Sequence, residues 1–260
     1  MSFCVYTILY TLEDKKPEEN DYIQMFLIWF AQFIKVKAAS SITLLVDTRT
    51  FEYLKNTAFC ILFNKIECNI SILHFPVPKT HLDGMKMKYT KFDYNEEYLM
   101  YLDIDILVLK PLVGLMDDLS KGVYIHRECM NEKDIEQHGH LDALNEEEKQ
   151  VVKGFGINLG ASAGKFIIKS KESRDALFQE IHTFIENNPN TTYYSVEQPI
   201  FNRAILCLGP ELNIGFLNNK YISTNFYNMS NDTILIDLCG EPGNGRNHLY
   251  KMIEGLIVYT

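Results

Sequence analysis

The sequence predicts an α/β protein with a parallel or mixed central sheet flanked by helices, and two observations lead to this fold class. In the first half of the chain, short apolar segments alternate with longer helical ones, which is typical of strands joined by helical crossovers. The segment Tyr98 to Leu109 is apolar except for Asp103 and Asp105, which predicts a central strand buried on both faces. No internal repeat and no linker of disordered composition interrupts the 260 residues, so we expect one domain.

The elements of the N-terminal half follow from their apolar spacing and from the polar residues that bound each apolar segment. Parallel strands meet at one edge of a sheet by their carboxyl ends, where ligands of such proteins bind, and Asp47 and the Asp103/Asp105 pair fall at this edge. The expected elements before Tyr98 are a strand over Phe3 to Tyr10, a helix capped by Asp21 and running to about Ala39, a strand over Ile42 to Val46, a helix from about Phe51 to Phe63, a strand over Ile70 to Phe75 and a helix around Met85 to Tyr94.

The C-terminal half begins with a polar segment, Met130 to Lys153, which predicts a surface excursion or helix. Small residues then alternate from Gly154 to Gly164, which indicates a close approach of backbone to a ligand or a tight bend before a strand. The elements expected after this point are a strand at Phe166 to Ile168, helices over Lys171 to Asn188 and Ser195 to Leu206, strands near Leu212 to Phe216, Ile222 to Tyr227 and Thr233 to Leu238, and a last helix from about Asn247 to Val258.

Composition excludes several classes of protein. A net charge of -9 and a pI near 5.3 argue against a nucleic-acid partner or an anionic membrane surface. The first 20 residues lack the features of a signal peptide, and the apolar run Met25 to Ala31 is too short to span a bilayer. The six cysteines are scattered without CxxC pairs, which is typical of reduced thiols. We therefore expect a cytoplasmic protein without a transmembrane segment.

Asp103 and Asp105 are the strongest functional signal in the sequence. Alternate residues of a strand face the same side, so a continuous strand would place both carboxylates together. Two buried anions need a compensating cation, and hard carboxylate oxygens favour Mg²⁺ or Mn²⁺. The alternative is an internal turn in which the two acids are solvated caps. The lack of glycine, proline or asparagine between residues 98 and 109 favours the strand and the metal site.

Four segments, in this order along the chain, resemble glycosyltransferases of the GT-A fold. The set is most similar to glycosyltransferase family 8, which includes glycogenin and bacterial galactosyltransferases. The resemblance implies a single Rossmann-like GT-A domain over residues 1–260, with a mixed central sheet, a nucleotide-sugar half of about residues 1–110 and an acceptor half of about residues 111–260. The segments are YLDIDILVLKPL (101–112), GINLGASAGKF (156–166), EQPIFN (197–202) and CGEPGNGRNHLYKM (239–252).

In this family the acidic pair binds Mn²⁺ or Mg²⁺, which bridges the diphosphate of a nucleotide-sugar, usually a UDP-sugar. The resemblance implies that Asp103 contacts the ribose and the metal and that Asp105 is a direct metal ligand. The third ligand of the family is a histidine. This chain has Asp237 in the corresponding segment, which is also a hard ligand, and His248 is the competing candidate.

The resemblance also implies residues that bind the rest of the donor. Glycines before the last expected helix, with the backbone N–H groups of its start, form a diphosphate site, and Lys251 follows one turn later. Without the resemblance, the same segment could equally be an ordinary turn followed by an exposed lysine. Lys88 matches the lysine that precedes the acidic strand in the family. The donor-binding set is Tyr6, Thr7, Lys88, Asp103, Gly240, Gly243 and Lys251, of which Tyr6 and Thr7 would border the base and ribose.

The acceptor side is implied by two matches to family motifs. Asn158 matches an Asn-Ser-Gly motif, and Glu197-Gln198 matches an Asp-Gln motif. Family 8 enzymes retain the anomeric configuration, and an amide or carboxylate near the anomeric carbon stabilises its oxocarbenium character. We expect Gln198 to have this role with Glu197 as helper, although Pro199 departs from the family pattern.

The sequence thus predicts a metal-dependent transfer of a hexose from a UDP-sugar to a hydroxyl of a glycan, protein or lipid. Two alternatives stay open. A sugar nucleotidyltransferase would carry a glycine-rich basic loop after the first strand, and the loop from Tyr10 to Pro17 has no glycine. A catalytically degenerate nucleotide- or sugar-binding module is favoured by Asp237 in place of histidine. The apolar run Phe26 to Phe33 leaves a homo-oligomer open.

Overall fold

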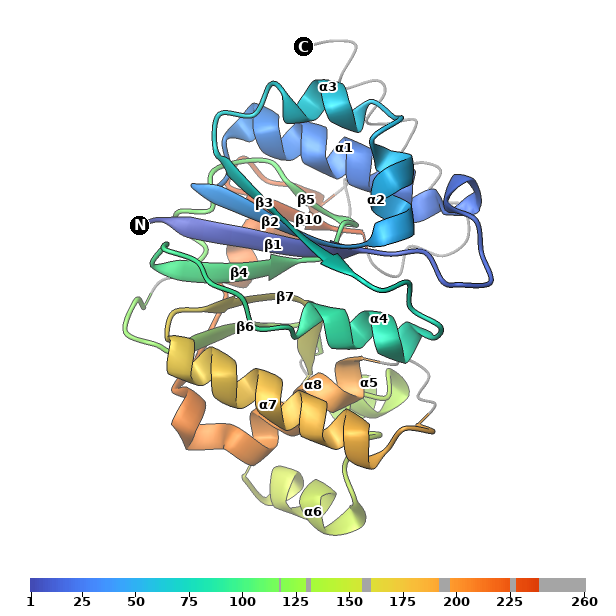
Figure 1. Cartoon of the computed structure of the whole chain (residues 1–260). Helices are drawn as coiled ribbons and strands as arrows, with labels where there is room; N and C mark the ends of the chain where they lie inside the picture. The colour runs from blue at the N-terminus through green and yellow to red at the C-terminus, as the bar shows by residue number, and fades with distance from the viewer. Residues whose placement is uncertain (117, 130–131, 156–159, 192–196, 225–227, 239–260) are drawn as a thin grey trace.

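The computed structural model describes residues 1–116, 118–129, 132–155, 160–191, 197–224 and 228–238 (Figure 1). Its centre is a mixed sheet of seven strands in the order β3-β2-β1-β4-β7-β6-β8. The pairs β1–β2, β2–β3, β1–β4 and β6–β8 are parallel, whereas β7 runs antiparallel to both β4 and β6. The strands are β1 (Phe3–Leu9), β2 (Ser41–Asp47), β3 (Asn69–Phe75), β4 (Tyr98–Leu102), β6 (Val123–Arg127), β7 (Ala161–Ile168) and β8 (Ile214–Phe216).

Helices cover both faces of this sheet (Figure 1). One group lies above the sheet in Figure 1 and comprises α1 (Asp21–Val36), α2 (Thr48–Leu54) and α3 (Phe59–Phe63). The other group lies on the lower side and comprises α4 (His81–Lys88), α5 (Glu132–Gln137), α6 (Glu146–Phe155), α7 (Lys171–Asn187) and α8 (Gln198–Leu208). This arrangement confirms the predicted α/β class with a mixed, helix-flanked sheet.

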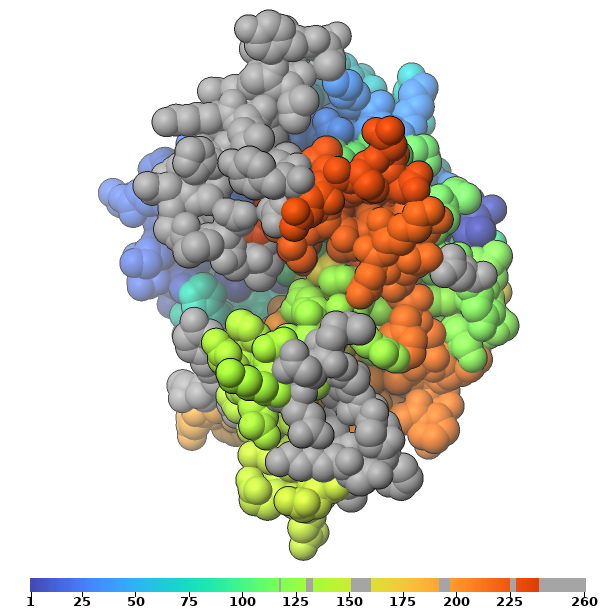
Figure 2. Space-filling model, turned by 180° about the vertical axis from the view of Figure 1, so that it is seen from behind, coloured from blue at the N-terminus to red at the C-terminus, as the bar shows by residue number. Residues whose placement is uncertain are grey.

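A second sheet of three strands packs against α1. It has the order β5-β10-β9, with β5 (Ile106–Val108) antiparallel to β10 (Leu235–Asp237), and β9 (Ile222–Ser223) parallel to β10. Figure 2 shows the orange-to-red segment that includes β9 and β10 against the green segment that follows β4, on the back of the molecule. The strand pair therefore joins the C-terminal part of the described chain to the end of β4.

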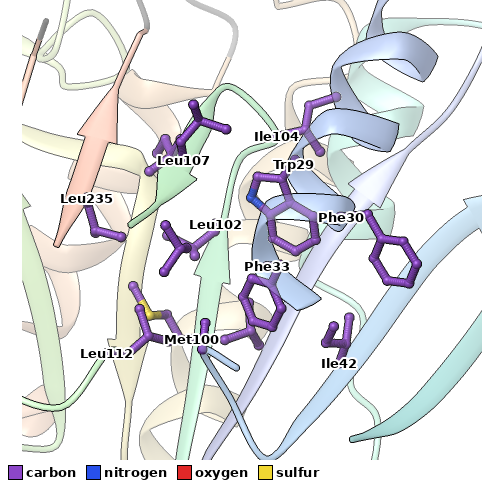
Figure 3. Close-up of a cluster of buried hydrophobic side chains, with 14 of the residues drawn as sticks. Trp29, Phe30, Phe33, Ile42, Met100, Leu102, Ile104, Leu107, Leu112 and Leu235 are labelled. Carbon is purple, nitrogen blue, oxygen red and sulfur yellow. The ribbon is translucent and has the colours of Figure 1, made fainter. Parts of the chain in front are cut away.

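Aromatic residues of α1 fill the space between the two sheets (Figure 3). Trp29, Phe30 and Phe33 are each at most 2% exposed, and the Trp29 and Phe33 rings stack at 4.9 Å between centroids. They belong to the same core cluster as Met100 of β4 and Leu235 of β10. The apolar run Phe26 to Phe33 is therefore largely used inside the chain, which removes the reason to expect a subunit interface there.

The predicted continuous strand over residues 98–109 is wrong, because it is broken at the two aspartates. β4 ends at Leu102, and the Ile106 N–H donates to the Asp103 carbonyl at 3.1 Å, which closes a turn. Both β4 and β5 are buried throughout, as predicted, but they belong to different sheets. Aspartate is unfavourable inside strands and common in turns, and the burial of the flanking residues hid this turn from the apolar pattern.

Other boundaries differ by small amounts. The cap of α1 is Asn20, whose side chain accepts from the Tyr22 N–H, instead of Asp21. The predicted helix over Phe51 to Phe63 is divided into α2 and α3, and α8 begins at Gln198. The polar segment after Met130 contains α5 and α6, and the expected last helix lies outside the described residues. None of the helices within the described ranges combines the length and the apolar character that crossing a bilayer requires.

Candidate functional site

A cavity of about 570 Å³ opens at the carboxyl ends of β1 and β4. This is the edge where ligands bind in open α/β sheets. Five acidic residues line it, and three of them lie on its sheet side, namely Asp103 and Asp105 from the turn after β4 and Glu197 from the start of α8. The other lining residues are Ile8, Leu9, Tyr10, Thr11, Leu12, Lys15, Glu19, Asn20, Asp21, Tyr22, His81 and Ile104.

The turn that carries the two aspartates is fixed by backbone hydrogen bonds at both ends. The Asp103 N–H donates to Gly164 O at 2.8 Å, and the Leu238 N–H donates to Asp105 O at 3.1 Å. A Cβ at Gly164 would lie 2.6 Å from Asp103 Oδ2, so a side chain there would displace the Asp103 carboxylate from its present position. The aspartate pair is thus held between β7 and the end of β10.

Asp103 keeps 40% of its side chain accessible, although the carboxylate lies deep enough in the cavity to lose much of its hydration. This burial raises the pKa of Asp103 to about 7, against the opposing effect of the Lys88 ammonium 4.0 Å away. Asp105 and Glu197 raise the pKa further by charge repulsion, while the Tyr101 hydroxyl, which donates to Asp103 Oδ1, favours the ionised form. A cation at this position would therefore be bound favourably.

Glu197 lines the cavity, and the ammonium of Lys88 contacts it from the protein interior. The Lys88 side chain is fully buried, and its ammonium contacts the Glu197 carboxylate, donates to Ala163 O at 2.5 Å and lies 3.7 Å from the centre of the Tyr101 ring. The Tyr89 hydroxyl donates to Glu197 Oε1 at 2.6 Å. Two donors from one helix terminus thus fix the Glu197 carboxylate beside the aspartates.

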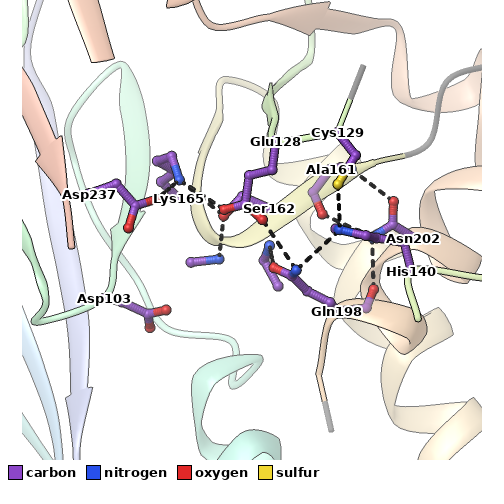
Figure 4. A network of polar contacts seen from close by, with 12 residues as sticks. Asp103, Glu128, Cys129, His140, Ala161, Ser162, Lys165, Gln198, Asn202 and Asp237 are labelled. Atoms are coloured by element: carbon purple, nitrogen blue, oxygen red, sulfur yellow. Dashed lines mark hydrogen bonds and ion pairs between the residues drawn. The ribbon is translucent and has the colours of Figure 1, made fainter. Parts of the chain in front are cut away.

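The side chain of Gln198 points away from the cavity that Glu197 lines. Its Oε1 accepts from the Ala163 N–H at 3.3 Å and its Nε2 donates to Glu128 Oε2 at 3.2 Å (Figure 4). Asn202, one turn later, bonds both the N–H and the carbonyl of Ala161, at 3.0 and 2.9 Å. These bonds anchor α8 on β7, and they engage the Gln198 amide in the protein instead of presenting it to the cavity. Asn158 lies outside the described residues.

Asp237, the expected third metal ligand, is bound by a lysine. It is 4% exposed, and its carboxylate pairs with the ammonium of Lys165, which also contacts Glu128 Oε1 and Ser162 Oγ, each at 3.2 Å (Figure 4). In the part of the chain that the structure describes, no three His, Cys, Asp or Glu side chains gather as a metal site. The convergence of Asp103, Asp105 and Asp237 on one ion is therefore not found in this arrangement, and the alternative, His248, is outside the described residues.

The expected base-binding residues lie deeper than the sequence suggested. Tyr6 and Thr7 are fully buried, and the Tyr6 ring packs against Tyr101 and Phe92. β1 meets the cavity through residues 8–12 instead, because its end, and not its middle, lies at this edge. Of the other expected donor-binding residues, Lys88 is at the site, whereas Gly240, Gly243 and Lys251 lie outside the described residues.

Sequence reasoning missed the pair of Tyr10 and His81. The Tyr10 hydroxyl lies 3.2 Å from His81 Nδ1, and both residues line the cavity. A Cβ at Gly84 would lie 2.3 Å from the Tyr10 ring, so the absence of a side chain there lets the ring lie against α4. Gly84 inside a helix was the available signal, since glycine in such a position often marks close packing.

Because His126 is buried, we expect the stability of the protein to depend on pH. Burial, with the nearby Lys165 charge, lowers the pKa of His126 from 6.5 to about 3, so the folded protein keeps it neutral while the unfolded chain protonates it. Unfolding then takes up a proton, and the free energy of unfolding falls as the pH decreases from 6.5 towards 3, by up to about 1.4 kcal/mol per pH unit. In urea titrations across this range, His126→Phe is expected to show a shallower decline. Equal slopes for the two proteins would contradict the assignment.

No family model and no curated protein matches the sequence, but solved structures match the fold. The galactosyltransferase LgtC, in complex with donor and acceptor sugar analogs, superposes with a TM-score of 0.58 at 15% identity, over 97% of this chain and 95% of LgtC. Mouse xyloside xylosyltransferase 1 gives 0.56 at 8% identity over 94% and 100% of the two chains. The chain has the GT-A glycosyltransferase fold.

A further match is the glycosyltransferase GlyE of Streptococcus pneumoniae TIGR4, with a TM-score of 0.51 at 14% identity. It covers 85% of this chain, but this chain spans only 46% of the GlyE chain. At such identities the matches show the GT-A fold and leave activity to be argued from the site. In this GT-A chain, the cavity with Asp103, Asp105 and Glu197 lies at the carboxyl edge of the parallel strands β1 and β4.

Proposed function

We propose that this protein is a glycosyltransferase that moves a hexose from a nucleotide-sugar, a UDP-sugar, to a hydroxyl acceptor with retention of configuration. The observation that supports this most is the grouping of Asp103, Asp105 and Glu197 on one cavity of a GT-A fold, beside the buried cation of Lys88. Glycan, protein and lipid hydroxyls are all chemically suitable acceptors.

We further propose that Asp103 and Asp105 hold Mn²⁺ or Mg²⁺. Both side chains offer hard oxygens to the same cavity, and these ions commonly bind to one or two carboxylates and complete their coordination with substrate phosphates. When bound, such an ion stabilises the departing nucleoside diphosphate as a Lewis acid. Asp237 is not included in this set, because Lys165 holds its carboxylate.

Within the Glu197-Gln198 pair, we assign the sugar-facing role to Glu197. Its carboxylate lines the cavity, whereas the amide of Gln198 is bonded to Ala163 and Glu128. A fixed carboxylate near an anomeric carbon stabilises positive charge that develops there. Lys88 and Tyr89 hold the carboxylate in place, so little reorganisation is needed during the reaction.

The degenerate binding module is the second candidate, and the ion pair between Lys165 and Asp237 is the observation that favours it. A module of this kind would bind nucleotide in the same cavity without transferring sugar. Release of UDP from UDP-sugars distinguishes the two functions.

A thermal-shift experiment tests the proposed donor site. UDP with Mn²⁺ at about 100 times the dissociation constant is expected to stabilise the protein by about 2.7 kcal/mol, which raises the melting temperature by about 5–10 °C. Asp105→Asn is expected to remove this shift, because it replaces an anionic metal ligand with a neutral side chain of the same size. The exposed Glu186→Gln serves as the control and should behave like the native protein.

Two outcomes would count against the proposal. An undiminished shift in Asp105→Asn would remove this aspartate from the donor site. A normal shift in the native protein, with no UDP released from any UDP-sugar in the presence of sugar acceptors or water, would support the binding module instead.

A further inference from the structure

Lys165 is the one charged residue of β7, and its side chain is fully buried. Burial of an ammonium group is costly unless anionic partners surround it. Lys165 has two such partners, Glu128 and Asp237, and the Ser162 hydroxyl as a third contact (Figure 4). Its ammonium thus links β7 and the end of β6 to β10 of the smaller sheet.

Asp237 lies next to the aspartate turn. β10 pairs with β5 in the register Asp237 to Ile106, the residue that follows Asp105. The N–H of Leu238 donates to Asp105 O at 3.1 Å, so the backbone of the turn at Asp105 is held next to the end of β10 that carries Asp237. Figure 4 shows Asp103 and Asp237 on the same side of β7, with the Lys165 ammonium directed at Asp237.

An ammonium group and a divalent ion compete for one carboxylate. The ammonium neutralises the charge that would attract the ion, and it repels an ion that comes within a few ångströms, since little water screens charges in this buried cluster. Lys165 therefore weakens divalent-ion binding at Asp237 in two ways. The effect does not depend on any other contact that Asp237 makes.

We propose that Lys165 acts as a built-in cation that removes Asp237 from the metal site, so that a divalent ion binds at Asp103 and Asp105 only together with the phosphates of the nucleotide. This inference rests on the proposed function. Lys165 is here a positioning residue, because it acts on the ion through Asp237 and not by contact with substrate. Loss of its charge converts Asp237 into a third carboxylate ligand.

The test measures Mn²⁺ binding without nucleotide, by the electron paramagnetic resonance signal of free Mn²⁺. All variants are made in a Glu128→Gln background. With Glu128 neutral, removal of Lys165 leaves only one of its two buried acidic partners, Asp237, without a cation. In this background, Lys165→Met is expected to raise Mn²⁺ affinity about tenfold or more, since ligand charge determines affinity at oxygen sites. Adding Asp237→Asn is expected to abolish the gain, and Lys169→Met, which removes an accessible lysine at the end of the same strand, is expected to leave affinity unchanged.

Circular dichroism and melting temperature verify that each variant is folded. A folded Glu128→Gln/Lys165→Met protein without increased affinity would overturn the inference, and so would an increase that persists after Asp237→Asn.

The native protein gives a second measurement that needs no variant. Mn²⁺ binding is expected only when UDP is present, and tight binding of Mn²⁺ alone would overturn the inference. The absence of Mn²⁺ binding even with UDP would instead overturn the proposed metal-dependent function, which keeps the two failures distinct.

Discussion

Replacing Lys165 with methionine in the native protein is expected to lower the free energy of unfolding by about 3–5 kcal/mol, because it leaves two buried carboxylates without their shared cation. Glu128 and Asp237 are 24% and 5% exposed at their side chains, so water compensates little for the lost charge. Burial by itself would raise the pKa of Glu128, but the Lys165 ammonium, together with a hydrogen bond to Ser162 and the nearby His126, more than offsets this and lowers the pKa to about 2. The ion pairs are therefore strong in the folded state and vanish with the lysine.

Urea unfolding at pH 7 measures this effect, and a triple variant separates charge from packing. In Glu128→Gln/Lys165→Met/Asp237→Asn the same volume is retained without any of the three charges, and most of the lost stability is expected to return, since neutral groups of similar shape often replace buried ion pairs at little cost. If the triple variant were as unstable as Lys165→Met, the alkyl packing of the lysine would be responsible instead. Lys169→Met, at the accessible position directly after β7, is the matched control.

The alternation of strands and helices was predictable from the sequence because it follows from local apolar spacing. β1, β2, β3 and the helices between them lie within a few residues of their expected positions. The break after Leu102 was not predictable in this way, because β4 and β5 are both fully buried and their combined sequence has the composition of one strand. What ends the strand is the backbone pairing of the turn with Gly164 and Leu238, which are distant in sequence.

Long-range pairing also explains what the sequence could not predict at the site. Asp103 and Asp105 could be identified from the residues alone, since acids in an apolar context are conspicuous, whereas the Glu197-Gln198 pair was indicated only by its resemblance to a family motif. The contact of Lys165 with Asp237 joins residues 72 positions apart, and no local pattern indicates it. A lysine within the otherwise uncharged segment ASAGKFII was the available signal, because a buried ammonium must have an anionic partner somewhere in the fold.

The resemblance to family motifs indicated the Glu197-Gln198 pair as a candidate, but it could not predict which member faces the cavity. Position in a motif carries no information on side-chain direction at the start of α8. The structure has the Gln198 amide bonded to Ala163 N and Glu128, and the Glu197 carboxylate bonded to Lys88 and Tyr89. This difference can be tested by kinetics.

Replacing Glu197 with glutamine is expected to reduce turnover in the proposed transfer by about 10²–10³-fold, the loss that follows removal of one preorganised electrostatic group at a reacting centre. UDP affinity in the presence of Mn²⁺ is expected to change much less, because Asp103 and Asp105 remain in place. Initial rates of UDP release at saturating UDP-sugar measure turnover, and calorimetry with UDP and Mn²⁺ measures affinity. The exposed Glu186→Gln on α7 is the control for loss of one carboxylate.

The comparison with Gln198→Ala decides the assignment. Loss of the Gln198 amide removes a bond to Ala163 and one to Glu128, so we expect a lower melting temperature with a smaller loss of turnover than in Glu197→Gln. If Glu197→Gln kept native turnover and Gln198→Ala lost it at unchanged stability, the sugar-facing role would belong to the amide. Lys88 is fully buried against Glu197, so Glu197→Gln could also lower stability, and its melting temperature must be measured. A loss of turnover in a fully folded variant shows a catalytic carboxylate, whereas a loss that accompanies unfolding shows a structural partner of Lys88.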